Sequence, residues 1–96
     1  MAIYKAEEWQ DTTTGYWHCN DTSNLGHNSG LWTHPARILG MTPADYLQWV
    51  IDNYKPDKVR YSNDASVVWF EWKNQAQMRK FKNFINSKAR QINYQI

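Results

Sequence analysis

The most regular hydrophobic pattern in the chain lies between residues 42 and 54. Apolar side chains recur there at helical spacing, at Tyr46, Leu47, Val50, Ile51 and Tyr54. This spacing places them on one stripe of a helix, which can pack against a core. Thr42 is a favoured N-cap residue, Pro43 suits the first helical position, and Pro56 cannot continue a helix. The pattern predicts a helix that begins after Thr42 and ends near Tyr54.

A second helical pattern covers residues 75–92. At about 100° per residue, one arc collects the apolar side chains Met78, Phe81, Ile85, Ala89 and Ile92, with Phe84 at its margin. Asn74 is a suitable N-cap for this helix, and Gln77 stands in the capping-box position. Polar side chains gather away from this arc, at Arg79, Asn83, Asn86 and Arg90, with Lys82 beside them. The pattern predicts a buried apolar face and a basic outer face.

Shorter alternating segments predict two β-hairpins. The first joins residues 2–9 to residues 16–19 through the turn sequence DTTTG, and the second joins residues 58–62 to residues 66–72 through NDA. Alternate side chains of a strand point to opposite faces, so Val68, Phe70 and Trp72 share one face of the last strand. We expect this apolar face to pack on the helices.

The connection between the first hairpin and the first long helix is the remaining segment. Residues 20–30 contain one apolar side chain, Leu25, and therefore predict a surface loop. Residues 32–40 predict a short helix that ends at Gly40. The resulting order is β-β-(short α)-α-β-β-α. It predicts a single α+β domain over residues 1–96, with two main helices on one face of a small, mostly antiparallel sheet.

Composition agrees with a compact domain and excludes several classes of protein. The chain is 42% hydrophobic and 16% aromatic, which argues against disorder. No apolar stretch approaches the ~20 residues of a membrane span, and residues 1–10 lack the apolar centre of a signal peptide. Cys19 is the single cysteine, so it cannot form an internal disulfide. We expect a cytoplasmic protein without contact with a membrane.

Charge is distributed unevenly along the chain. Residues 1–54 contain two Lys or Arg and six Asp or Glu, whereas residues 55–96 contain nine Lys or Arg and three Asp or Glu. Such asymmetry bears on association with a polyanion or an acidic protein. Folding could also interleave the two halves, so that the acidic part neutralises the basic part.

The outer face of the C-terminal helix is the first candidate binding site. Residues 75–92 carry five Lys or Arg and no Asp or Glu, so the helix lacks pairs of opposite charge four residues apart. Arginine forks and asparagine amides reach phosphates and base edges. We predict contact with nucleic acid or a nucleoprotein through Arg79, Lys82, Asn83, Asn86 and Arg90. A solvated face without a partner is the alternative.

The second hairpin adds two candidates for the same site. Trp69 faces away from the apolar side of its strand and lies opposite Arg60 or Lys58. An indole beside a guanidinium group is suited to stacking on bases. We predict that Arg60 and Trp69 contact the nucleic acid. Packing of Trp69 against the first hairpin is the alternative.

A partner protein is the second hypothesis for the target. Eleven residues, 20–30, form a longer loop than most connections, and long ordered loops are often functional. The candidate contacts are Asn24, His27, Asn28 and Trp32. Together with the acidic N-terminal half, they could mimic a nucleic-acid surface. The chain would then inhibit a host protein by binding it.

Metal binding and catalysis have weaker support in the sequence. His18, Cys19, His27 and His34 lie close together, but they fit no standard zinc spacing, because His18 and Cys19 are adjacent on a predicted strand and point to opposite faces. Zinc is therefore a third hypothesis, and no cofactor is our main expectation. His18 does not supply the geometry of a base for a Cys19 nucleophile. We find no paired carboxylates or phosphate loop and expect no enzymatic activity.

One segment carries a resemblance to known proteins. Residues 34–55, HPARILGMTPADYLQWVIDNYK, resemble segments of small uncharacterised proteins from phages and prophages of Gram-positive bacteria. The resemblance covers about a quarter of the chain. It implies a short accessory protein made in a bacterial cytoplasm, similar in size and origin to anti-CRISPR proteins, which usually act by binding. A host defence protein is therefore a further possible partner.

Overall fold

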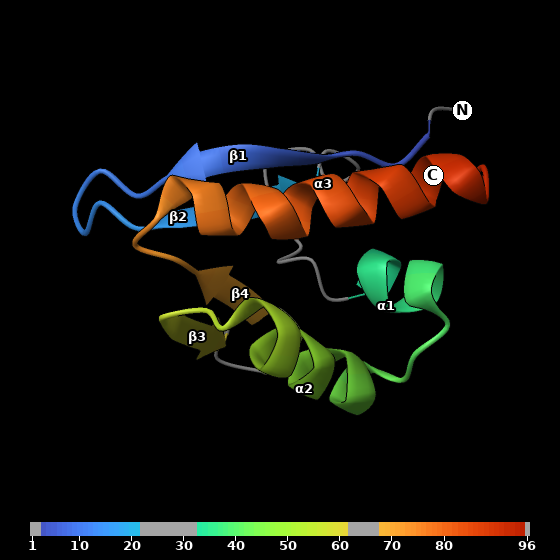
Figure 1. The fold of residues 1–96 in the computed structure, drawn as a ribbon, viewed down its shortest axis with the longest axis horizontal. Coiled ribbons are helices and arrows are strands. Elements are labelled where there is room, and N and C mark those ends of the chain that lie inside the picture. Colours follow the sequence, from blue (N-terminus) through green and yellow to red (C-terminus); the bar gives the residue numbers. More distant parts are fainter. Residues whose placement is uncertain (1–2, 22–32, 62–67, 96) are drawn as a thin grey trace.

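The computed structural model of the chain describes residues 3–21, 33–61 and 68–95. The elements along the chain are β1 (Ala6–Gln10), β2 (Trp17–Asp21), α1 (Thr33–Leu39), α2 (Pro43–Tyr54), β3 (Lys58–Tyr61), β4 (Val68–Glu71) and α3 (Gln75–Gln91) (Figure 1). This order confirms the predicted α+β fold. Within the described residues, no helix combines the length and the apolar character that crossing a bilayer requires.

The strands form two antiparallel hairpins, each a sheet of two strands. In the first, Trp9 pairs with His18 and Glu8 with Cys19, and in the second, Arg60 pairs with Trp69. An isolated bridge between Trp17 and Trp72 joins the two sheets through backbone hydrogen bonds of 2.6 and 2.8 Å. The four strands are thus divided between two sheets that touch, where the sequence suggested one small sheet.

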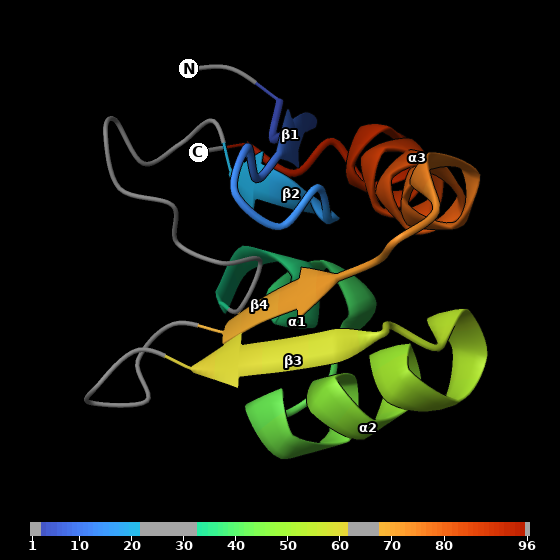
Figure 2. The ribbon, with the colours of Figure 1, turned by 90° about the vertical axis from the view of Figure 1, so that its left-hand side faces the viewer.

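α3 packs on both hairpins, whereas α2 packs on the second hairpin and on α3. α3 lies beside β1 and β2, while α2 lies against the second hairpin, as Figure 2 shows. Tyr46 of α2 contacts Phe70 of β4, with ring centroids 5.9 Å apart in an edge-to-face arrangement. Val68, Phe70 and Trp72 are all buried, which confirms that they share the core face of their strand.

α2 has the boundaries that its sequence predicts. The Thr42 hydroxyl accepts a hydrogen bond from the Asp45 backbone N–H at 3.2 Å, and Pro43 opens the helix. At the other end, Lys55 adopts a left-handed conformation with φ of 47° and donates its backbone N–H to the Ile51 carbonyl. Trp49 lies outside the predicted stripe, yet it packs against the core and widens the buried face.

α3 is capped and buried largely as predicted. Asn74 accepts hydrogen bonds from the backbone N–H groups of Ala76 and Gln77 at 2.8 and 3.2 Å. Its core residues Met78, Phe81, Ile85 and Ala89 are fully buried. The prediction for Ile92 was wrong, because this side chain is 52% exposed. Since α3 ends at Gln91, helical spacing no longer sets the direction of Ile92.

Residues near the two ends of the chain meet at one side of the fold. Ile3 and Gln95 form an isolated antiparallel bridge, and the Tyr4 backbone N–H donates to the Tyr94 carbonyl at 2.9 Å. The Tyr94 hydroxyl also contacts Nδ1 of His34, on α1, at 2.9 Å. These contacts hold the segment after α3 against the start of the chain and thereby fix the orientation of α3.

Candidate functional site

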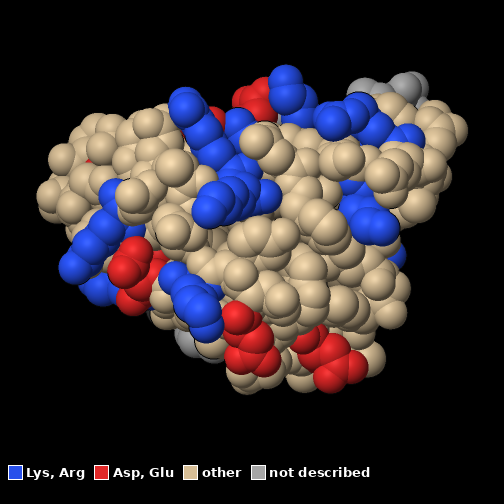
Figure 3. All heavy atoms as spheres, viewed as in Figure 1, with Lys and Arg blue, Asp and Glu red and all other residues tan. Residues whose placement is uncertain are grey.

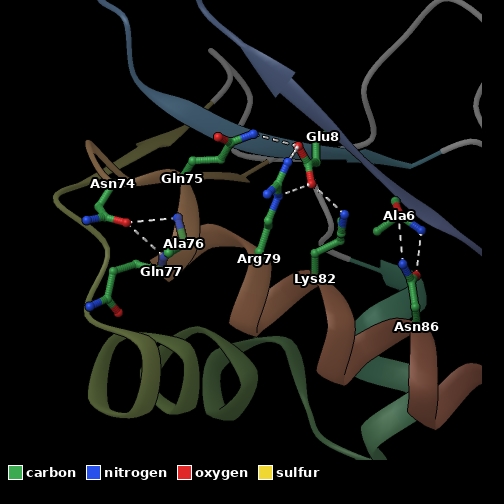
Figure 4. A network of polar contacts seen from close by, with 9 residues as sticks. All are labelled: Ala6, Glu8, Asn74, Gln75, Ala76, Gln77, Arg79, Lys82 and Asn86. Carbon is green, nitrogen blue, oxygen red and sulfur yellow. Dashed lines mark hydrogen bonds and ion pairs between the residues drawn. The ribbon is translucent and has the colours of Figure 1, made fainter.

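One flank of α3 faces β1, and the polar side chains on this flank are paired within the fold. Gln75, Arg79, Lys82 and Asn86 recur at i, i+4, i+7 and i+11 and therefore share this flank. Figure 4 shows all four side chains directed at the backbone or side chains of β1. The helical wheel locates the core arc of α3, but it does not show that a strand lies along its edge.

Three of these side chains, Gln75, Arg79 and Lys82, contact Glu8 of β1. We call these four residues the Glu8 cluster. Nε and Nη2 of Arg79 donate to the two carboxylate oxygens at 2.6 and 3.2 Å. Nζ of Lys82 donates at 2.6 Å and Nε2 of Gln75 at 3.0 Å. Arg79 and Lys82 are therefore neutralised by the acidic half of the chain, which is the alternative that the charge distribution left open.

The cluster stabilises the ionised form of its carboxyl group. Hydrogen bonds from Arg79, Lys82 and Gln75 lower the pKa of Glu8 from its ordinary value of 4.5 to about 2, against a smaller effect of burial. The same contact raises the pKa of Arg79 above its usual value. Sequence reasoning missed Glu8 and Gln75, because the contact spans 71 residues between Arg79 and Glu8. One signal in the sequence could have indicated this contact: the first predicted strand contains acidic residues, and the last predicted helix contains basic ones.

Asn86 was predicted to contact nucleic acid, and its position contradicts that prediction. The residue is buried, and its side-chain amide makes two hydrogen bonds to the backbone of Ala6. Oδ1 accepts the Ala6 N–H at 2.8 Å, and Nδ2 donates to the Ala6 carbonyl at 3.0 Å. Both polar ends of the amide are thus used within the fold. Asn86 positions α3 on β1 and is not accessible to a ligand.

A second row of polar residues on α3 faces solvent. We call Lys80, Asn83 and Arg90 the outer face of α3, because all three are exposed. Their side chains make no hydrogen bond or ion pair to another described residue. Lys88, beside this row, is half-buried, with Nζ 5.9 Å from the centroid of the Phe84 ring. Asn83 and Arg90 are the two predicted contacts that remain free on this helix.

The surface charge around this row is mostly positive. Figure 3 shows Lys and Arg gathered over α3, while acidic groups lie mainly at the lower edge, over α2, with others at the left and at the top edge. α3 carries five Lys or Arg and no acid, and within the described residues Glu8 is the one carboxylate that pairs with them. The acidic half of the chain therefore neutralises α3 only in part.

The second hairpin places Arg60 and Trp69 together, as predicted. The Arg60 guanidinium carbon lies 5.3 Å from the centroid of the Trp69 ring. Arg60 also donates from Nε to the buried Glu71 carboxylate at 2.7 Å. Trp69 is half-buried, and its Nε1 is enclosed without a hydrogen-bond partner among the described residues. This guanidinium group is therefore already paired, and it offers a ligand less charge than the outer face of α3.

The candidate loop contacts cannot be placed. Asn24, His27, Asn28 and Trp32 lie outside the described residues. The hypothesis of a partner protein held by this loop therefore stays a prediction. The same holds for the turn of the second hairpin, at residues 63–65.

The candidate metal ligands are only partly described. Within residues 3–21, 33–61 and 68–95, no three His, Cys, Asp or Glu side chains are grouped as a metal ion requires. His27 lies outside these residues. Burial raises the pKa of Cys19 to about 12, which disfavours the thiolate that a metal or an electrophile needs. Nδ1 of His34 is already 2.9 Å from the Tyr94 hydroxyl.

A pocket near the start of α3 was not predicted. Its volume is about 460 Å³, and Tyr54, Asp57, Trp72 and Asn74 are among its lining residues. Two polar groups there already have partners: Nε1 of Trp72 donates to the Tyr54 carbonyl at 2.7 Å, and Asp57 accepts the Lys73 backbone N–H at 2.8 Å. These contacts make the pocket part of the join between the second hairpin and α3.

Comparisons with protein-family models, with curated proteins and with solved structures gave no match. The resemblance of residues 34–55 to phage proteins stays a prediction, as does the bacterial cytoplasm that it implies. Functional inference for this chain therefore depends on its own geometry, above all on the two rows of polar residues along α3.

Proposed function

We propose that the chain is a non-enzymatic module that binds nucleic acid or a nucleoprotein through the outer face of α3. The observation that carries the proposal is the exposure of Lys80, Asn83 and Arg90 without partners among the described residues. α3 as a whole carries five cations, and Glu8 offsets one of these charges. Such an unbalanced basic surface favours a polyanion.

The spacing along α3 is compatible with contacts to several phosphates. Lys80 and Arg90 are ten residues apart, which corresponds to about 15 Å along the helix axis. Along the axis of duplex DNA that distance covers about four nucleotides of one strand. Asn83 lies between them, and its amide can pair with a base edge or a phosphate oxygen. The outer face therefore offers two charge contacts and one neutral, directional contact.

Salt dependence of binding tests this proposal. Lys80→Ala and Arg90→Ala should each weaken binding of a labelled oligonucleotide and lower the slope of log affinity against log salt by about one. Fluorescence anisotropy at several salt concentrations, with duplex and single-stranded probes, measures both quantities. Arg37→Ala is the matched control, because Arg37 is an exposed cation on α1. Salt-insensitive binding, or none at low salt, would contradict the proposal.

The partner-protein hypothesis predicts a different outcome. A complex with a host protein should survive nuclease treatment and should weaken on Trp32→Ala substitution. A pull-down from bacterial lysate, with and without nuclease, separates the two hypotheses. Loss of the captured material after nuclease treatment supports binding through nucleic acid.

A further inference from the structure

We propose that Gln75, Arg79 and Lys82 form a site for an oxyanion, that Glu8 is its internal occupant, and that a phosphate of bound nucleic acid competes with Glu8 for it. The inference rests on the proposed function for its ligand class. It goes beyond that function because it assigns a second phosphate site on the other flank of α3. It also implies that Glu8 lowers the affinity of the chain for nucleic acid.

The arrangement of donors around Glu8 is that of an anion site. Arg79 contributes two donors in its planar fork, Lys82 one ammonium group and Gln75 one amide. All four contacts, at 2.6 to 3.2 Å, converge on the two oxygens of one carboxylate. Guanidinium forks pair with phosphate in the same two-point geometry as with carboxylate. The donors therefore do not distinguish Glu8 from a phosphate group of similar size.

The helix backbone that carries these donors is held in place without Glu8. Gln75, Arg79 and Lys82 project from the same flank of one helix, at i, i+4 and i+7. The helix itself is fixed by the Asn74 cap and by its buried apolar face. Asn86, one turn beyond Lys82, keeps that flank next to β1 through its two bonds to Ala6. Removal of the Glu8 carboxylate should therefore leave a vacant site instead of a collapsed one.

The site is open enough for an external phosphate. The Arg79 side chain is 52% exposed, and those of Lys82 and Glu8 are 20% and 22% exposed. A carboxylate on the same chain has a high effective concentration, so free phosphate should not displace it. When Lys80 and Arg90 already hold a polyanion, its neighbouring phosphates lie close to the site. Their effective concentration there is then comparable to that of the Glu8 carboxylate. Glu8 is then expected to lower the affinity for nucleic acid.

The neighbouring residue Glu7 supplies a matched control. Glu7 and Glu8 carry the same charge on adjacent positions of β1, but Glu7 is exposed and lies 3.9 Å from Lys5. Long-range repulsion of nucleic acid should be similar for both carboxylates. Of the two carboxylates, Glu8 is the one that accepts hydrogen bonds from Arg79 and Lys82. A difference between the Glu8→Ala and Glu7→Ala proteins therefore measures the site and not the net charge.

The first experiment uses inorganic phosphate alone. At constant ionic strength, phosphate should raise the melting temperature of the Glu8→Ala protein by about 4 °C relative to chloride. The wild-type and Glu7→Ala proteins should show no such shift. Equal shifts in all three proteins, or no shift in Glu8→Ala, would overturn the anion site. If Glu8→Ala does not fold, Glu8→Gln is the second variant, in which one acceptor oxygen remains and a smaller shift is expected.

The second experiment uses a labelled oligonucleotide at low salt. Glu8→Ala should bind about threefold or more tightly than Glu7→Ala, and its salt slope should increase by about one to two as Arg79 and Lys82 join the contact. Equal or weaker binding than Glu7→Ala would overturn competition by Glu8. If none of the three proteins binds the oligonucleotide but phosphate stabilises Glu8→Ala, the result supports the anion site and contradicts the proposed function.

Discussion

Tyr46 lies in the middle of the core, with its hydroxyl group among apolar neighbours. The side chain is fully buried, and its hydroxyl oxygen has no hydrogen-bond partner among the described residues. Burial raises the pKa of this phenol well above its usual value, so the group stays neutral. A buried hydroxyl without a partner costs about 1–3 kcal/mol of stability. The ring of Tyr46, which contacts Phe70, still contributes to packing.

Tyr46→Phe should therefore leave the protein equally stable or make it more stable, by up to about 1 kcal/mol. The substitution removes the unpaired hydroxyl and keeps the ring. Urea unfolding, followed by fluorescence, gives the free energy of unfolding of both proteins. Tyr46→Ala is the control, and its loss of the ring should cost about 3–5 kcal/mol. If Tyr46→Phe destabilises the protein by more than about 1 kcal/mol, the hydroxyl makes a favourable contact.

At the scale of elements, Asn86 joins α3 to β1. Its amide pairs with both the N–H and the carbonyl of Ala6, as the backbone of a neighbouring strand would. Asn86→Ala should cost about 1–3 kcal/mol, because it leaves two buried backbone groups unpaired. Asn83→Ala is the matched control, since Asn83 is exposed on the same helix and should change stability by less than about 0.5 kcal/mol. Equal effects of the two substitutions in urea unfolding would contradict this role of Asn86.

The sequence predicts the elements well because their signals are local. The Thr42 and Asn74 caps and the Pro43 start each act within one helical turn, and both long helices begin where these residues indicate. The apolar period then identifies the buried face of each helix, with Ile92 as an exception beyond the helix end. Neither signal requires knowledge of what else packs nearby.

The candidate site was less predictable because its geometry is set by residues far apart in the chain. A helical wheel puts Arg79, Asn83, Asn86 and Arg90 on one side of α3. The structure separates them, because β1 lies along one flank of the helix. There Arg79 contacts Glu8, which is 71 residues away in the chain, and Asn86 contacts Ala6, which is 80 residues away. No local pattern in the sequence shows which flank of a helix a strand will cover.

At the scale of the whole molecule, the described residues of the acidic half neutralise the basic half only in part. Glu8 lies among the cations of α3, whereas Asp45 and Asp52 lie on α2. Figure 3 shows Lys and Arg gathered over α3 and acidic groups mainly at the lower edge, with others at the left and at the top edge. A molecule with such a division orients in the field of a polyanion before contact. The outer face of α3 would then meet the ligand first.

Acid should loosen this molecule through Glu8. The pKa of Glu8 is depressed in the folded state, from 4.5 to about 2, by Arg79, Lys82 and Gln75. A group with a depressed folded pKa contributes stability that is fully present above its unfolded pKa, near 4.5, and is lost as the pH falls toward 2. Protonation of Glu8 would remove the ion pairs that tie α3 to β1.

The comparison of wild type with Glu8→Gln isolates this contribution. Wild type should be the more stable protein at pH 7, and its advantage should shrink steadily between pH 4.5 and 2, because Gln does not titrate. Urea unfolding at several pH values measures the difference, and other acidic groups cancel because both proteins contain them. An advantage that stays constant down to pH 2 would show that Glu8 acts through packing. An advantage that grows on acidification would contradict the sign of the pKa change.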